Sequence, residues 1–238
     1  KKIPYFDLKK QYKIIGEDLE KSIIKTLRST NYALGPEVEK FESNFSNYIG
    51  TNYCAGVNTG TSALHLALLA AGIGSGDEVI TVSMTFIATV MSISYTNAKP
   101  VFVDVEDKTL TMNPDLIESK INSRTKAILV VHLYGQCADM NKISKIAKKN
   151  NLFLIEDSSQ AHGAKYKNNN AGSIGDFGTF SFYPGKNLGA CGEGGAVTSN
   201  NKKLIDKVKG LRNWSQPRRY EHTEISYNYR MDGLQAAS

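Results

Sequence analysis

The sequence has few cysteines and no long apolar run. Its 238 residues include three cysteines, Cys54, Cys137 and Cys191, which are far apart and form no Cys-x-x-Cys pair. An odd number of widely spaced cysteines argues against a disulfide framework and against a zinc site. No segment is apolar over the roughly 18 residues that a membrane span needs, and residues 1–7 lack the apolar stretch of a signal peptide. We therefore expect a cytoplasmic protein that does not contact a membrane.

The sequence also lacks any strong clustering of charge. Lys and Arg number 29 against 23 Asp and Glu, which gives a net charge of +6. A clustered basic excess would favour a nucleic-acid partner, but here the basic residues are dispersed among acidic neighbours. A solvated surface, or the attraction of a small anionic substrate, explains the charge better than nucleic-acid binding. Outside the N-terminus, basic doublets occur at residues 148–149, 202–203 and 218–219.

Short apolar segments alternate with helical segments over most of the chain. Hydrophobic residues make up 41% and charged residues 22%, as in an ordinary globular domain. Apolar strands separated by helices predict an α/β fold with a mostly parallel sheet covered on both faces. The expected strands are residues 53–57, 78–82, 101–105, 127–132, 152–155, 177–183 and 195–198, with a polar turn at 167–170. The expected helices are residues 61–71, 87–95, 140–149, 202–211 and 231–238.

The first candidate site is a phosphate cradle at residues 58–64. The run Asn-Thr-Gly-Thr-Ser-Ala-Leu follows an expected strand and opens an expected helix. Small residues such as Gly60 let the backbone approach a ligand, and the free N–H groups of a helix N-terminus attract anions. Thr and Ser at helix starts are also common caps, so this segment alone leaves both interpretations open.

Two further segments supply a carboxylate and an amine. The apolar strand at residues 152–155 delivers Asp157 to the carboxyl edge of the sheet, where ligands gather. There Asp157 could pair with a protonated ring nitrogen, hold a metal or cap a loop. Lys186 follows a Pro-Gly turn after the strand at residues 177–183, and a surface position is the usual interpretation of such a lysine alone. A nucleophilic lysine must be neutral, which burial and cationic neighbours favour.

Together, the three segments supply the parts of a pyridoxal phosphate site. The cradle can anchor the phosphate, Asp157 can keep the pyridine nitrogen protonated, and Lys186 can carry the cofactor as a Schiff base. The combination is far more specific than any single segment. We therefore predict a pyridoxal 5'-phosphate enzyme.

The sequence resembles the sugar aminotransferases of the DegT/DnrJ/EryC1/StrS family over essentially the whole chain. The resemblance implies the large domain of a type I pyridoxal-phosphate aminotransferase, with a mostly parallel seven-stranded sheet between helices. Residues 1–238, the N-terminal segment included, are expected to form this domain. Family members continue into a small C-terminal domain, which we expect to be absent from this chain. The matching segments are residues 3–8, 60–64, 85–89, 99–104, 156–157, 160–163, 192–195 and 235–237.

The resemblance also implies a role for each matching residue. Lys186 matches the Schiff-base lysine, and Asp157 matches the partner of the pyridine nitrogen. Phe86 matches an aromatic side chain that stacks on the cofactor ring, and Gln160 matches a residue beside the ring hydroxyl. The phosphate ligands of the family match Gly60, Thr61 and Ser181.

The implied partners are a second subunit and two substrates. Asn228 matches an asparagine that reaches the phosphate of the neighbouring subunit, which implies a homodimer with shared active sites. The implied reaction moves an amino group from L-glutamate to a keto sugar on a nucleotide diphosphate. Four arginines are candidates for binding the diphosphate: Arg212, Arg218, Arg219 and Arg230.

The run at residues 183–189 narrows the expected sugar position. Tyr-Pro-Gly-Lys-Asn-Leu-Gly is similar to members that aminate C3 of a keto-deoxyhexose, whereas members acting at C4 more often carry a His-Pro-Val-Lys-like run. Amination at C4 remains an alternative. Two others are a sugar dehydratase and a non-catalytic regulator that kept the fold. Related dehydratases carry His in place of the lysine, so Lys186 argues against that alternative.

Overall fold

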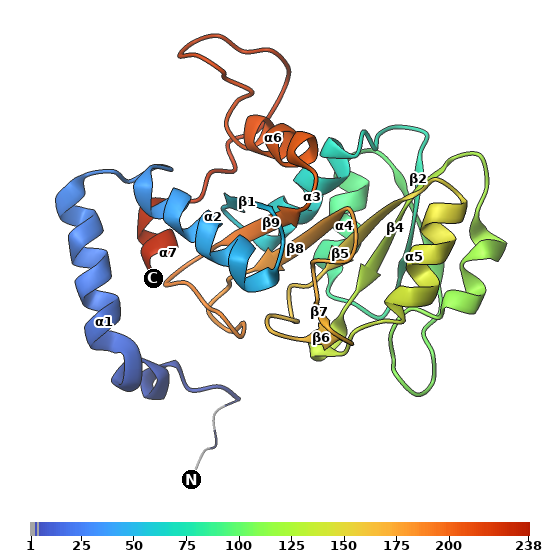
Figure 1. Ribbon diagram of the computed structural model, residues 1–238, viewed down its shortest axis with the longest axis horizontal. Helices are drawn as coiled ribbons and strands as arrows, with labels where there is room; N and C mark the ends of the chain where they lie inside the picture. Colours follow the sequence, from blue (N-terminus) through green and yellow to red (C-terminus); the bar gives the residue numbers. More distant parts are fainter. Residues whose placement is uncertain (1–2, 4) are drawn as a thin grey trace.

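The computed structural model describes residue 3 and residues 5–238, and a seven-stranded sheet forms its centre (Figure 1). Three residues lie outside the described part of the chain: Lys1, Lys2 and Pro4. All three belong to the segment 1–7 that was searched for a signal peptide, and Pro4 also belongs to the family-matching segment 3–8. The strands are β1 (Tyr53–Val57), β2 (Glu78–Val82), β3 (Lys99–Val103), β4 (Thr125–Val131), β5 (Phe153–Asp157), β8 (Phe177–Ser181) and β9 (Gly195–Ser199).

The strands follow the order β1-β9-β8-β5-β4-β2-β3 across the sheet. Parallel pairing links β3, β2, β4, β5 and β8, whereas β9 pairs antiparallel with both β8 and β1. Six of the seven strands therefore point the same way, and β9 is reversed. This arrangement confirms the predicted α/β fold with a mostly parallel seven-stranded sheet.

Helices cover both faces of the sheet. α2 and α5 lie on one face, and α3, α4 and α6 lie on the other (Figure 1). The α-helices are α1 (Leu8–Ser29), α2 (Pro36–Ile49), α3 (Gly60–Ala70), α4 (Ile87–Tyr95), α5 (Met140–Lys149), α6 (Lys202–Leu211) and α7 (Gly233–Ala237). Short 3-10 helices span Pro114–Leu116, Glu118–Lys120 and Leu133–Gly135, and a small hairpin joins β6 (Lys165–Tyr166) to β7 (Asn169–Asn170).

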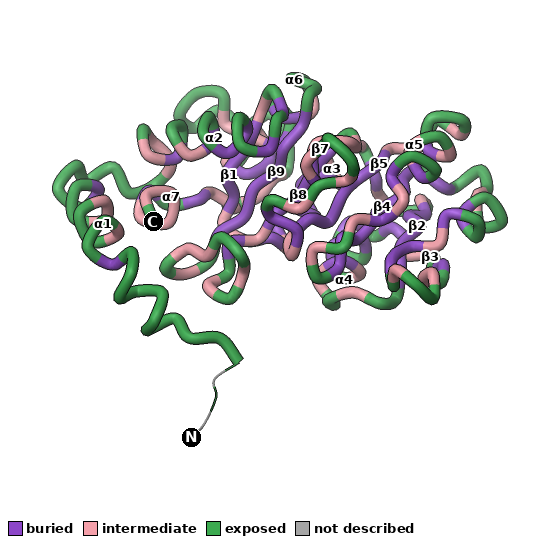
Figure 2. Tube along the Cα trace, turned by 60° about the horizontal axis from the view of Figure 1, so that its bottom comes forward, coloured by how far each residue is buried: buried purple, intermediate pink, exposed green. Residues whose placement is uncertain are grey.

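The core follows the central strands. Ile80, Ile128, Leu129 and Ile155 have no exposed surface, which explains why these strands are continuous apolar runs. Figure 2 shows the buried trace concentrated along the sheet, whereas α1 is mostly exposed. α1 packs beside α7 and extends away from the sheet (Figure 1).

Several element boundaries differ from the expected ones. β3 begins at Lys99 rather than at residue 101 and includes Pro100, which a strand at the sheet edge tolerates because one side needs no ladder hydrogen bonds. The expected polar turn at 167–170 is the β6–β7 hairpin, and the last helix is shorter than residues 231–238. α1 and α2 were not among the expected helices, although the Asp7 cap and the first-turn Pro36 are helix-start signals. In α1 a buried stripe is missing, since only Gly16 and Thr26 are buried.

Each of the three cysteines is a free thiol. Burial, together with the charge of Glu156, raises the pKa of the Cys137 thiol to about 11, so this thiol stays protonated at neutral pH. Within the described part of the chain, no helix has the length and apolar character needed to cross a membrane.

Candidate active site

The carboxyl ends of the parallel strands surround a cavity of about 710 Å³. Parallel strands deliver their ends to one edge of a sheet, so loops that are distant in sequence meet there. Seven of the eight predicted site residues line this cavity, and Asn228 does not. The seven are Gly60, Thr61, Phe86, Asp157, Gln160, Ser181 and Lys186.

The N-terminus of α3 provides free donors at one wall of the cavity. The Thr59 side chain caps the helix by accepting the Ser62 N–H at 2.9 Å. Within the described residues, no hydrogen bond takes the N–H groups of Gly60 or Thr61. Such free N–H groups at a helix N-terminus bind anions. This geometry fits a phosphate group.

Gly60 has a steric reason to be glycine. A Cβ atom at this position would lie 2.6 Å from the Cβ of Ser181, so no side chain fits there. The absence of a side chain lets the start of α3 lie directly against the end of β8. The hydroxyl of Ser181 is thereby brought beside the free N–H groups of the helix.

Two hydrogen bonds orient Asp157. Its Oδ2 accepts the Thr89 hydroxyl at 2.7 Å, and its Oδ1 accepts the Ser159 N–H at 3.1 Å. The carboxylate is 6% exposed and lines the cavity, so it is a fixed negative group suited to a cationic ring nitrogen. Among the described residues, no three His, Cys, Asp or Glu side chains gather into a metal-binding group.

Thr89 is a site residue that the sequence interpretation missed. It lies in α4, has no exposed surface, and its hydroxyl also lies 2.7 Å from that of Thr85. Thr85 lines the cavity. Thr85 precedes the N-cap of α4, so no helical spacing in the sequence pointed to this pair.

Lys186 lies in a turn closed by its own N–H, which donates to the Tyr183 carbonyl at 2.8 Å. It lines the main cavity and also a neighbouring cavity of about 590 Å³. Burial and the positive charge of Lys186 lower the pKa of His162 to about 4, so this imidazole is neutral at pH 7. His162 packs against the Phe180 and Phe182 rings. Its burial against these two rings indicates a structural role.

Phe86 and Gln160 line the same cavity from different loops. Phe86 caps α4 and is 66% exposed, so it offers an aromatic face to a ligand. The Gln160 Oε1 accepts the Tyr134 N–H at 2.9 Å, which fixes the side chain. Tyr134 itself has a left-handed backbone with φ of 55°, a conformation uncommon for a tyrosine.

Comparison with known proteins places this site in a family. Residues 13–238 match the model of the DegT/DnrJ/EryC1/StrS aminotransferase family. The chain belongs to this family. It is 48% identical over 235 residues to the dTDP-3-amino-3,6-dideoxy-alpha-D-galactopyranose transaminase of Aneurinibacillus thermoaerophilus, covering 99% of this chain and 65% of that protein.

Two solved structures of this aminotransferase fold are closely similar. The chain superposes on S. venezuelae DesV, solved with a ketimine intermediate, with a TM-score of 0.96 and 43% identity, over 99% of this chain and 63% of that one. It superposes on NtdA from Bacillus subtilis with bound PMP at a TM-score of 0.92 and 33% identity, over 99% of this chain and 54% of that one. The chain spans 62% to 66% of the length of the first four curated relatives it matches.

In this family member, Asn228 points away from its own core. The N–H groups of Tyr227 and Tyr229 each donate at 2.9 Å to the Leu211 and Arg212 carbonyls, so the segment is extended. Both tyrosine rings pack on His65, with centroid distances of 5.0 and 6.0 Å. Because successive side chains of an extended segment point to opposite sides, Asn228 faces outward, and it is exposed.

Of the four candidate diphosphate ligands, Arg212 is wrong. It is 6% exposed, and its Nη1 lies 2.5 Å from Glu42 and contacts the Gly56 carbonyl. Glu42 also accepts the Lys209 amine at 2.6 Å. Arg212 therefore belongs to a buried ion pair between α6 and α2 and is not available to a substrate. Arg230 donates to Asn213, whereas Arg218 and Arg219 are exposed.

Proposed function

We propose that the protein is a pyridoxal-phosphate-dependent aminotransferase that moves an amino group from L-glutamate to a keto sugar on a nucleotide diphosphate. Aminotransferases of this family depend on pyridoxal 5'-phosphate. The observation that carries the proposal is the meeting of Lys186, Asp157 and the α3 N-terminus in one cavity. We further propose that residues 1–238 form the cofactor-binding domain and that the enzyme acts in the cytoplasm.

The lining residues fit the cofactor group by group. The phosphate would be held by the free N–H groups of Gly60 and Thr61 and by the Ser181 hydroxyl. Asp157 would pair with the ring nitrogen, because a fixed carboxylate favours its protonated form. Phe86 would stack on the ring, and Gln160 would lie beside the ring hydroxyl. When bound, pyridoxal phosphate supplies an electron sink for breaking a bond at the α-carbon of the donor.

Lys186 would perform two tasks. Its amine would link covalently to the cofactor and would be displaced by the amine of the donor. The freed amine would then move a proton between the donor's α-carbon and the C4′ carbon of the cofactor, as a general acid and base. Since Lys186 lines both the 710 Å³ and the 590 Å³ cavities, it lies between a space for cofactor and a space for substrate.

We propose C3 as the position that is aminated. The run at residues 183–189 supports C3, and so does the printed name of the relative that is 48% identical, a 3-amino transaminase. The second cavity, which is lined by Tyr5, Phe6 and Tyr134 among others, offers aromatic surfaces to the nucleotide sugar.

Borohydride reduction of the loaded protein tests the function. We expect a stable pyridoxyl label on the peptide that contains Lys186, because reduction makes the Schiff-base bond permanent. Incubation with L-glutamate before reduction should remove the label and release 2-oxoglutarate. A label on another lysine would overturn the site. A correctly placed label without release of 2-oxoglutarate would favour a dehydratase or a regulator.

We also propose a homodimer in which Asn228 completes the phosphate site of the partner. The support is its outward orientation together with an exposed apolar face beside the cavity mouth. That face contains the large side chains Met84, Phe86, Ile87, Met91 and Tyr95, each at least 37% exposed. Apolar side chains gathered in this way are typical of protein interfaces.

Mixed dimers provide a sharp test of this sharing. Asn228→Asp places a carboxylate against the phosphate of the partner, so we expect weaker cofactor binding by about tenfold or more. Lys186→Ala removes the amine of its own site. Subunits carrying one change each, when mixed and refolded, should regain about a quarter of the wild-type sites, because one hybrid site contains neither change. Activity that stays at the level of the separate variants would show that Asn228 acts within its own subunit.

A further inference from the structure

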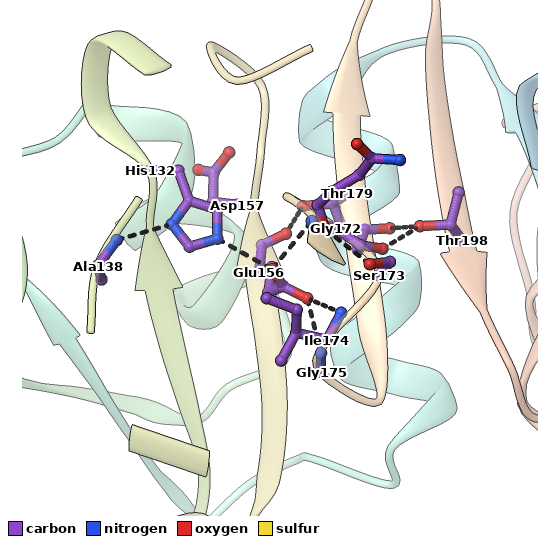
Figure 3. A network of polar contacts seen from close by, with 12 residues as sticks. His132, Ala138, Glu156, Asp157, Gly172, Ser173, Ile174, Gly175, Thr179 and Thr198 are labelled. Carbon is purple, nitrogen blue, oxygen red and sulfur yellow. Dashed lines mark hydrogen bonds and ion pairs between the residues drawn. The ribbon is translucent and has the colours of Figure 1, made fainter. Parts of the chain in front are cut away.

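Glu156 and His132 form a buried pair beside Asp157 (Figure 3). The His132 Nε2 lies 2.9 Å from the Glu156 Oε2, and neither side chain has any exposed surface. Glu156 precedes Asp157 on β5, and the two side chains point to opposite faces of the strand. Glu156 does not line the cavity, whereas His132 does, so any influence of Glu156 on the reaction must pass through its neighbours.

The Glu156 carboxylate accepts four hydrogen bonds. Three come from the N–H groups of the loop at residues 172–175, and the fourth comes from His132. Each of the two carboxylate oxygens accepts two of these hydrogen bonds, so the acceptor capacity of the group is fully used. A buried carboxylate needs this satisfaction, because an unpaired one is strongly unfavourable. The loop donors are Gly172 at 2.9 Å, Ile174 at 2.7 Å and Gly175 at 2.6 Å.

The same network indicates which ring nitrogen of His132 donates. Its Nδ1 accepts the Ala138 N–H at 3.3 Å, so its Nε2 carries the proton that is donated to Glu156. The two hydrogen bonds hold the imidazole in one orientation. Its ring can rotate only if both hydrogen bonds break.

This network is joined to the backbone of Asp157. The His132 N–H donates to the Asp157 carbonyl at 3.0 Å, and the Thr179 hydroxyl donates to the Glu156 carbonyl at 3.0 Å. On the far side, the Gly172 carbonyl accepts the Thr198 hydroxyl at 2.7 Å. The carboxyl edge is therefore fixed across β4, β5, β8 and β9 at the point where Asp157 enters the cavity.

We infer that Glu156, acting through His132 and the 172–175 loop, is a positioning residue that holds Asp157 against the cofactor ring. The inference rests on the proposed function, since it requires a cofactor that Asp157 contacts. A hydrogen bond between Asp157 and a ring nitrogen depends on a few tenths of an ångström. Glu156 accepts four hydrogen bonds beside the end of β5, and these bonds can set the position of Asp157 without any contact between Glu156 and the ligand.

Glu156→Gln tests the inference, with Glu78→Gln as a matched control. Glu78 is also a buried glutamate, 3% exposed, and accepts Asn122 at 2.8 Å and Arg124 at 2.7 Å, but it starts β2 at the opposite edge of the sheet. In both variants an amide replaces a carboxylate that accepts N–H donors, so both should lower the melting temperature.

We expect only Glu156→Gln to change cofactor binding. The dissociation constant of this variant for pyridoxal phosphate should rise by about tenfold or more. The pH midpoint of the visible absorption band of its bound cofactor should also shift. Equal loss of thermal stability in the two variants, with wild-type affinity and band position in both, would overturn the inference. A wild-type protein that binds no pyridoxal phosphate would instead overturn the proposed function.

His132 variants keep the test decisive if Glu156→Gln does not fold. His132→Gln retains an N–H that can donate to Glu156, whereas His132→Leu removes it. We expect the band and affinity of His132→Gln to lie closer to wild type than those of His132→Leu. If the two variants give identical spectra and affinities, the hydrogen bond to Glu156 has no positioning role.

Discussion

Replacement of Lys186 by alanine should lower the rate of the glutamate half-reaction by about 10⁴-fold or more. The variant loses both the covalent link and the base that moves the proton, and general acid–base catalysis alone accounts for about 10²- to 10⁴-fold. Cofactor binding should be reduced much less, because the α3 N-terminus, Asp157 and Phe86 remain. Single-turnover measurement of 2-oxoglutarate release, with bound cofactor followed by absorbance, separates the two effects.

Two comparisons make the Lys186 result specific. Lys167→Ala changes an exposed lysine of the β6–β7 hairpin and should leave the rate unchanged. A small primary amine added to Lys186→Ala should restore part of the proton transfer, since it can enter the space that the side chain leaves. A Lys186→Ala rate within tenfold of wild type would refute the assigned role.

The sequence was informative where one local segment determines the structure. Buried runs such as residues 78–82 are recognisable because both faces of a parallel strand are covered by helices. The same pattern explains why Gly60, Asp157 and Lys186 could be selected before any geometry was known. Each follows or ends a strand, and strand ends of a parallel sheet converge at one edge.

The residues that were missed depend on partners far away in the chain. Thr89 bonds to Asp157 across 68 positions, and the Arg212 partner, Glu42, lies 170 positions away. No local periodicity encodes such pairs, so the sequence could not distinguish the buried Arg212 from the exposed Arg219 as a diphosphate ligand. The reversed direction of β9 could not be predicted either, because the sequence of a short apolar strand does not indicate whether it pairs parallel or antiparallel.

Asp157→Asn should lower kcat for the glutamate half-reaction by about 10²- to 10³-fold, in the range seen when one pre-organised electrostatic contact is lost. The asparagine has nearly the same shape, and its carbonyl oxygen can still accept the Thr89 hydroxyl. What changes is the charge that keeps the ring nitrogen protonated. The loss should therefore appear mainly in the chemical step. The melting temperature should fall only slightly, because the amide leaves one donor, the Ser159 N–H, without its acceptor.

Thr89→Val provides the contrasting variant, because it removes the hydroxyl that orients Asp157 but leaves the charge. If charge is the main contribution of Asp157, Thr89→Val should retain much more activity than Asp157→Asn. If orientation dominates, the two variants should be similarly slow. Rates of α-proton exchange from deuterated glutamate, measured in both variants, distinguish these cases because exchange reports proton removal without the later steps. Wild-type exchange in Asp157→Asn would mean that the carboxylate does not face the ring nitrogen at all.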